Sequence, residues 1–294
     1  MLIPKGLCDE IEAMVRQFIW SSTNASKNIA LVNWELICQT NAHSGLGVKA
    51  LRDHNMSFIM KLGFKLVTDH SSLWVNVLWS KYGVQNRLLE SLSMGRCSFL
   101  WRFLSKIWPL IRENLLWSVG NGRKINCWKD SWVPKVGPLS KKIVCTTNLD
   151  MDCPLSDMVT ENGDWNLDFF RLWLSEDIIQ KIVRIPPPQS NSGSDIIIWE
   201  ETTSGAFTVK STYNKLREDS WHIKEDVWKL PRKYIGPQRV KVFIWLILKH
   251  RLLTNVERIR RGLGSDTACG TCGHHYENIL HVLRDCRTAR KIWL

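Results

Sequence analysis

The chain has 294 residues, enough for two domains with hydrophobic cores of ordinary size. Apolar residues make up 44% and charged residues 23%, a balance that excludes a wholly disordered chain. The formal net charge is +12, and residues 224–294 hold 15 Lys or Arg against 6 Asp or Glu, a net +9. This basic end favours RNA or DNA as a partner, because Lys and Arg displace the counterions of phosphates. Solubility and an acidic protein partner are the alternatives.

The nine cysteines are odd in number, and most have no close neighbour in the sequence. Six are scattered, namely Cys8, Cys38, Cys97, Cys127, Cys145 and Cys153. This distribution favours a reducing compartment over a disulfide scaffold. No apolar run approaches the roughly 18 residues of a membrane span, and the N-terminus lacks a signal-peptide core. We therefore expect an intracellular protein, nuclear or cytoplasmic, without a transmembrane segment.

The first part of the chain is predicted to be mainly helical. Apolar residues recur there at three- and four-residue spacings, with charged residues between them. The pattern predicts helices at 7–20, 51–67, 73–79 and 98–116. Most of the 16 tryptophans fit these helical spacings or strand spacings, which favours core packing over base stacking.

The pattern changes after residue 116. An alternating segment surrounds Asn121-Gly122, a pair typical of a type I′ hairpin turn, so two short strands are expected there. A Pro- and Ser-rich stretch at 186–194 predicts a linker. Beyond it, a second hairpin-like unit is predicted, with strands at 196–199 and 207–209. Helices should follow at 210–216 and 240–253.

These elements predict an α-rich α+β fold. A helical region over 1–115 is followed by a Trp-rich hairpin and irregular connector over 116–185. The linker at 186–194 then leads to a small α+β domain over 195–294.

One cluster of residue types indicates chemistry. Cys269 and Cys272 form a Cys-x2-Cys turn, His281 follows after eight residues, and Cys286 follows after four more. Such a turn brings two thiolates to the spacing of tetrahedral zinc, and His281 and Cys286 can supply the other two ligands. Three sulfurs and one nitrogen leave no open position, so the expected zinc site is structural. The alternative is a set of unmetallated thiols.

Two histidines next to the turn compete for the same role. His274 and His275 lie too close behind Cys272 to close a comfortable chelate ring, so we do not expect them to bind the metal. Arginines around the motif are candidate contacts to nucleic acid, or else an ordinary solvated face. They are Arg251, Arg258, Arg260, Arg261, Arg284 and Arg287.

Residues 195–293 resemble the zinc-binding domain of plant LINE-type reverse transcriptases, which belong to non-LTR retrotransposons. The resemblance rests on segments 195–200, 205–213, 243–245, 251–254 and 260–262, and on the run from Cys269 to Trp293. Upstream, Phe18-Ile19-Trp20, Gly45-Leu46-Gly47, Gly120-Asn121-Gly122 and Trp128-Lys129-Asp130 are similar to the segment that follows the polymerase core in those proteins. Ser44 departs from the pattern, since the family usually has a glycine there.

The resemblance implies an accessory part of a larger polymerase rather than an enzyme. No Asp-Asp pair is present to hold the two metal ions of a polymerase, and the carboxylates of a ribonuclease H, which often follows in the family, are not recognisable. We expect a non-catalytic, zinc-binding fragment that binds nucleic acid, with the parent's polymerase core as a possible partner. The alternatives are a structural or protein-interaction remnant without binding activity, and an active RNA-directed DNA polymerase.

Overall fold

The computed structural model describes residues 3–20, 29–83, 88, 91–92, 95–143, 149–221 and 225–293, and Cys145 lies outside them. The chain divides into two compact units. The central unit is His54–Leu216, and the terminal unit joins Ile3–Asp53 to Arg217–Leu294. Helices and a two-stranded antiparallel sheet confirm the predicted α-rich α+β class. The predicted division of the chain at 186–194 into two parts that fold independently stays a prediction.

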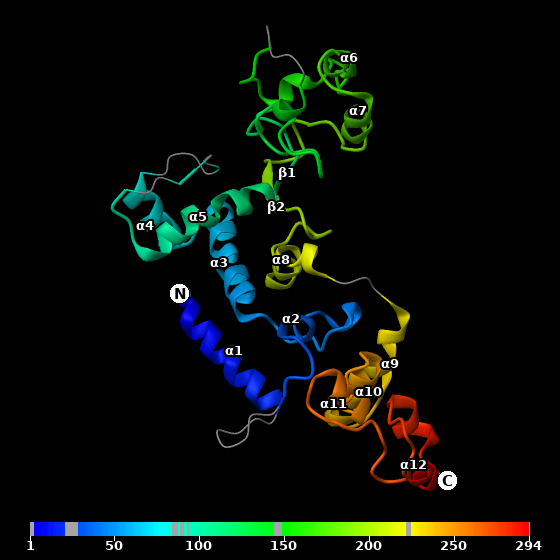
Figure 1. Ribbon diagram of the computed structural model, residues 1–294. Helices are drawn as coiled ribbons and strands as arrows, with labels where there is room; N and C mark the ends of the chain where they lie inside the picture. Colours follow the sequence, from blue (N-terminus) through cyan, green and yellow to red (C-terminus); the bar gives the residue numbers. More distant parts are fainter. Residues whose placement is uncertain are drawn as a thin grey trace. The chain divides into compact units, whose positions relative to one another are not determined.

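The four helices predicted in the first part of the chain are confirmed, whereas the helix predicted over 240–253 begins at Gln238 and ends at Leu248 (Figure 1). The central unit contains most of α3 (Leu51–Thr68), together with α4 (Leu73–Tyr82), α5 (Phe99–Glu113), α6 (Leu167–Arg171), α7 (Glu176–Val183) and α8 (Val209–Leu216). The terminal unit contains α1 (Lys5–Ile19), α2 (Trp34–Ile37), α9 (Lys229–Lys233), α10 (Gln238–Leu248), α11 (Asn255–Arg260) and α12 (Arg287–Trp293). Short 3-10 turns lie at Asn41–His43, Leu139–Lys142, Leu155–Met158, Glu218–Ser220 and Asp226–Trp228.

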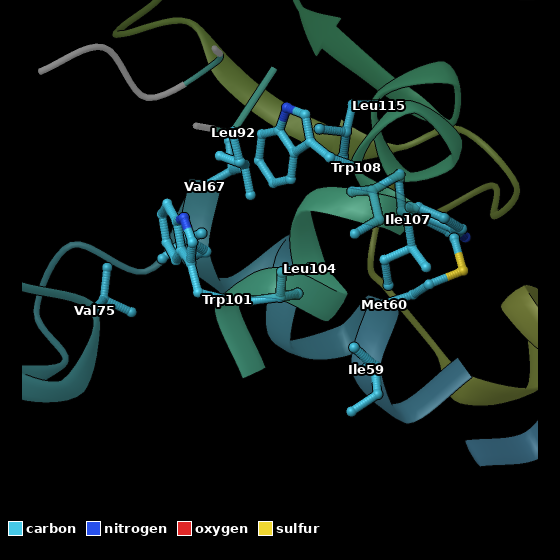
Figure 2. Packing of buried hydrophobic residues seen from close by; sticks show 13 residues of the cluster. Ile59, Met60, Val67, Val75, Leu92, Trp101, Leu104, Ile107, Trp108 and Leu115 are labelled. Atoms are coloured by element: carbon cyan, nitrogen blue, oxygen red, sulfur yellow. The ribbon is translucent and has the colours of Figure 1, made fainter. Parts of the chain in front are cut away.

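Helix α5 organises the first core of the central unit. Ser98 caps it by accepting a hydrogen bond from the Trp101 amide at 3.3 Å. Figure 2 shows Trp101, Leu104 and Trp108 packed with residues of α3 such as Met60. The tryptophans of this helix are therefore core residues, as predicted.

Gly63 of α3 allows the two helices to approach closely. A Cβ atom built at Gly63 would lie 2.3 Å from Ile111 Cδ1, on the buried face of α5. This contact explains a small residue within a long helix.

A second core of the central unit lies within residues 125–185. Trp128 and Trp132 are fully buried there, and Trp132 stacks on Trp165 with ring centroids 5.3 Å apart. The Trp132 indole N–H donates to the Cys127 carbonyl at 2.8 Å. The connector that looked irregular in the sequence is therefore organised around aromatic side chains rather than around long helices or strands.

The strand pairing differs from the prediction. The strand β1 (Leu115–Ser118) pairs antiparallel with β2 (Ile196–Trp199), with Trp117 opposite Ile197. The expected hairpin across Asn121-Gly122 was wrong. The Asn121-Gly122 pair indicated a turn, but β2, the partner of β1, lies about 80 residues further along the chain. A pattern of neighbouring residues does not predict such a distant pairing.

The hairpin expected between 196–199 and 207–209 is also wrong, because Val209 begins α8. A turn does occur between the two segments, where the Trp199 amide donates to the Gly205 carbonyl at 2.8 Å. Gly205 has a φ of +69°, so the glycine permits the turn.

The terminal unit has its own small core around α10. Trp245 is buried, and its indole N–H donates to the Ser44 carbonyl at 2.8 Å. Ser44 adopts a φ of +69°, a conformation that favours glycine. This explains why the family that the chain resembles usually has a glycine at this position. The Lys249 ammonium donates to Ser44 Oγ at 2.6 Å. Among the described residues, no helix is both long and apolar enough to cross a membrane.

Candidate metal centre

Four side chains of the terminal unit converge at one point. The potential ligand atoms of Cys269, Cys272, His281 and Cys286 all lie within 4.8 Å of one another. This is the set that the sequence spacing predicted. Three of the four residues are buried, and Cys272 is half-buried.

The first two cysteines lie on a tight turn. The Gly273 amide donates to the Cys269 carbonyl at 2.9 Å, and the Cys269 amide donates to the His274 carbonyl at 2.8 Å. Gly273 has a φ of +73°, which a residue with a side chain rarely adopts. The turn therefore orients both sulfur atoms toward the same side.

The other two ligands come from a single π-helical turn, His281–Asp285, which leads into α12. The Cys286 amide donates to the His281 carbonyl at 2.8 Å, an i to i+5 bond. This wide turn explains the five-residue spacing, since it returns Cys286 to the side occupied by His281. His281 is held at its own amide, which donates to Asn278 Oδ1 at 2.7 Å.

Backbone hydrogen bonds stabilise the charged form of one of the cysteines, Cys286. Backbone N–H groups of Ala289 and Thr288 lower the pKa of the Cys286 thiol, because they stabilise its negative charge. His281 Nε2 lies 3.3 Å from Cys272 Sγ, so this nitrogen faces the centre of the cluster. Three sulfurs and one nitrogen at these separations fit a tetrahedral soft-to-borderline cation such as Zn²⁺.

The competing histidines lie beside the cluster. His274 stacks on His281 with ring centroids 4.7 Å apart and an interplanar angle of 13°. His274 and His275 are both exposed, and neither belongs to the group of converging ligands. This geometry agrees with their exclusion from the predicted ligand set.

Two hydrogen bonds donated by Asn255 connect the start of α11 to the segment that contains the Cys-x2-Cys turn. The Asn255 amide donates to Glu277 Oε1 at 3.0 Å, and Asn255 Nδ2 donates to the Ala268 carbonyl at 2.6 Å. The two bonds connect the start of α11 to the residues on either side of the Cys-x2-Cys turn. The turn is therefore supported by protein contacts as well as by its own backbone.

Three of the six candidate arginines lie close to one buried carboxylate, that of Glu257. Glu257 accepts hydrogen bonds from Arg260 at 2.6 and 2.7 Å and from Arg261 at 2.7 Å, and Arg251 lies 3.5 Å away. The hydrogen bond from Arg260, together with that from Arg261, outweighs the opposing effect of burial and lowers the pKa of Glu257 to about 2. Arg284 pairs with its neighbour Asp285 at 2.7 Å.

Glu257 was not among the functional residues predicted from the sequence. Its position was nevertheless signalled, because Thr254 and Glu257 stand three apart in the spacing of a capping box. Thr254 Oγ1 accepts from the Glu257 amide at 3.3 Å, which starts α11. The Glu257 carboxylate accepts hydrogen bonds from Arg260 and Arg261 rather than from the backbone N–H of Thr254, which donates to the Leu252 carbonyl.

Arg261 has a second engagement. Its guanidinium donates to the carbonyls of Ala30 and Leu31 at 3.1 and 2.7 Å, in addition to Glu257. The Arg258 and Arg287 side chains are exposed, and no ion pair involves them among the described residues.

The four converging side chains lie within a segment that is similar to a known zinc-binding family. Residues 207–293 match the family described as "zinc-binding in reverse transcriptase". The resemblance of the chain to the C-terminal region of plant retrotransposon reverse transcriptases is thereby confirmed.

Two proteins of Arabidopsis thaliana are similar to the chain. "Putative ribonuclease H protein At1g65750" is 28% identical over 305 residues, covering 100% of this chain and 48% of the relative. "Uncharacterized mitochondrial protein AtMg00310" is 27% identical over 138 residues, covering 47% of this chain and 90% of the relative. The chain thus spans about half the length of the first relative. No solved structure gives a significant match.

Proposed function

We propose that Cys269, Cys272, His281 and Cys286 bind one structural Zn²⁺ ion. The observation that supports this proposal is the convergence of all four ligand atoms within 4.8 Å. Four protein ligands fill a tetrahedral shell and leave no position for substrate or water. The bound ion would cross-link the cysteine turn to the π-helical turn, so its role is to hold the fold rather than to perform chemistry.

The terminal unit with its zinc is proposed to act as an accessory nucleic-acid-binding module of a retroelement protein. Residues 224–294 carry a net charge of +9. Bound Zn²⁺ against three thiolates changes that charge by only about −1 relative to neutral thiols, so the basic surface is retained. Phosphate contacts of this type are strong at low salt and carry little sequence information.

Arg258 and Arg287 are the foremost candidates for phosphate contacts, because both are exposed and lack an ion pair among the described residues. Arg260 and Arg284 are exposed, but Arg260 pairs with Glu257 and Arg284 pairs with Asp285. Arg251 lies 3.5 Å from Glu257. Arg261 is directed at Glu257 and two backbone carbonyls, so we assign it to the fold. The six predicted arginines therefore divide into exposed contacts and structural groups.

We also propose that the chain has no polymerase or ribonuclease H activity of its own. Among the described residues, the group of side chains placed to hold a metal is rich in sulfur, whereas both reactions use hard Mg²⁺ ions held by carboxylates. Primer extension and RNA cleavage assays with the purified chain and Mg²⁺ test this point. Activity that disappears on changing one pair of acidic residues to amides would overturn it.

The alternative function is a structural or protein-interaction remnant with no affinity for nucleic acid. Two measurements on the full chain separate it from the proposal. Metal analysis after purification under reducing conditions should give one zinc per chain. Titration with single-stranded RNA and with a DNA hairpin should give affinity that falls steeply between 50 and 200 mM salt, as expected for several phosphate contacts. Zinc without salt-dependent binding would favour the remnant, and absence of zinc would overturn the metal site.

A further inference from the structure

A second pair of cysteines, Cys127 and Cys153, lies in the aromatic core of the central unit. Asn126 and Pro154 form an antiparallel bridge. The Cys127 amide donates to the Cys153 carbonyl at 3.1 Å, and the Leu155 amide donates to the Ile125 carbonyl at 2.8 Å. These two bonds flank the bridge, so Cys127 and Cys153 are directly opposite each other.

Directly opposed residues point to the same face of an antiparallel pair. Both side chains accordingly contact the same core, with Cys127 fully buried and Cys153 half-buried at its edge. The Cα atoms of opposed residues lie about 4.5–5.5 Å apart. Disulfide-bonded cysteines have Cα separations of about 4.4–6.8 Å. The Cα spacing of an opposed pair therefore falls within the range of disulfide-bonded cysteines.

We infer that Cys127 and Cys153 are a site of reversible disulfide formation. The oxidant is a low-molecular-weight disulfide such as glutathione disulfide. The Cys153 sulfur attacks it, forms a mixed disulfide and releases one glutathione. The Cys127 sulfur then attacks the Cys153 sulfur and releases the second glutathione. The two protein thiols are oxidised, one glutathione disulfide is reduced to two thiols, and the two protons pass to them.

The local chemistry sets the order of these steps and their pace. Cys153 is the accessible partner, whereas burial and then the neighbouring Cys153 raise the pKa of Cys127. Burial also raises the pKa of Cys153, and the indole of Trp128 acts against that increase. Thiolate is the attacking form, so both steps are slow at neutral pH. The bond is a response to sustained oxidation rather than a fast catalytic disulfide.

The geometry also makes the bond reversible. Opposed Cβ atoms lie about 4.5–5.5 Å apart, whereas a disulfide draws them to about 3.5–4.5 Å. The two segments must therefore move toward each other, and departures from relaxed geometry make a disulfide easier to reduce.

The test is incubation of the zinc-loaded full chain with a series of glutathione disulfide and glutathione mixtures, followed by trapping of free thiols. A combined trypsin and Asp-N digest separates the three cysteines of this region, because cleavage after Lys129 and Lys142 and before Asp150 and Asp152 divides them. The expected product is a peptide pair that joins Cys127 to Cys153, with loss of two thiols and full recovery on addition of dithiothreitol.

Peptide mapping of the unmodified chain needs no variant, so a misfolded mutant cannot obscure the result. Cys127→Ala should stop the reaction at a glutathione adduct on Cys153, while Cys97→Ser, in the same unit, should leave the Cys127–Cys153 product unchanged. A stable glutathione adduct on Cys153 in the unmodified chain would overturn the inference. A bond from Cys153 to Cys145, or no loss of either thiol, would do the same.

Discussion

Asp195 Oδ1 accepts the backbone N–H of Gly122 at 2.9 Å, across 73 residues of sequence. The same oxygen accepts the Gly120 amide at 2.8 Å, and Oδ2 accepts the Lys124 amide at 3.0 Å. Asp195 is only 4% exposed, so a buried carboxylate satisfies three backbone donors of one loop. This contact explains why a Gly-Asn-Gly segment and an aspartate before β2 occur in one chain.

Asp195→Asn should destabilise the central unit by about 2 kcal/mol. The change removes the charge from three charge-assisted hydrogen bonds and turns an amide N–H₂ toward at least one donor. Chemical denaturation followed by tryptophan fluorescence measures the effect. Asp164→Asn is the matched control, because that side chain is exposed on a turn, and it should change stability by less than about 0.5 kcal/mol. Equal stabilities for the two variants would contradict the role of Asp195.

Gly122→Ala should also destabilise the loop that Asp195 binds, in this case through a change in the loop itself. Gly122 has a φ of +70°, and a Cβ there would lie 2.8 Å from both the Pro188 Cβ and the Ser156 amide nitrogen. Strain and steric overlap together should cost at least about 1–2 kcal/mol. Gly137→Ala is the control for strain alone, since Gly137 has a φ of +75° with open space around it. A smaller loss at Gly122 than at Gly137 would show that the close contact is unimportant.

Removal of zinc should unfold the C-terminal part of the terminal unit. Metal-binding energy becomes folding energy where the unfolded chain has no site, and residues 269–293 bury few large apolar side chains beyond the ligands. Hydrogen exchange with and without chelator should show lost protection over 254–293 and unchanged protection over 99–183. Cys286→Ser should reproduce this without chelator, and Cys97→Ser should not. Retained protection over 281–293 in the metal-free chain would contradict the prediction.

Glu257→Gln should destabilise the terminal unit by about 2 kcal/mol at neutral pH, because the charge that organises three arginines is lost. The folded pKa of about 2 lies below the usual value of 4.5. The stabilisation is therefore fully present above about pH 4.5 and disappears as the pH falls toward 2.

The measurement is the difference in unfolding free energy between the Glu257→Gln variant and the unmodified chain at several pH values. Loss of zinc is expected to unfold residues 254–293, which include Glu257, so the comparison uses only pH values at which metal analysis shows that both proteins retain zinc. Equal unfolding free energies of the two proteins at neutral pH would show that the Glu257 charge contributes nothing.

Replacement of Arg258 and Arg287 together by alanine should weaken nucleic-acid binding at low salt. Each phosphate contact contributes about one unit to the slope of log K against log salt, so the slope should fall by about 2. Fluorescence anisotropy with a single-stranded RNA and a DNA hairpin provides the measurement. Arg184→Ala, exposed in the central unit, is the control and should leave the slope unchanged. An unchanged slope for the double variant would place the contacts elsewhere.

The sequence by itself determined the long helices and the set of four side chains that converge in the terminal unit. Helical periodicity is local, so the buried face of α5, with Trp101, Leu104 and Trp108, was visible in the spacing. The ligands of the metal centre were equally visible, since a Cys-x2-Cys turn and a five-residue His–Cys spacing each close within one turn of chain.

Only the tertiary structure decided the long-range pairings. The sequence did not reveal that β1 pairs with β2, that Asp195 holds the Gly120–Gly122 loop, or that Cys127 faces Cys153. Each of these depends on register between segments distant in the chain, which local propensity does not encode. The arginines divide for the same reason. Their charge follows from the sequence, but folding decides which of them contact the buried Glu257 carboxylate, as Arg260 and Arg261 do, and which have no ion pair among the described residues, as Arg258 does.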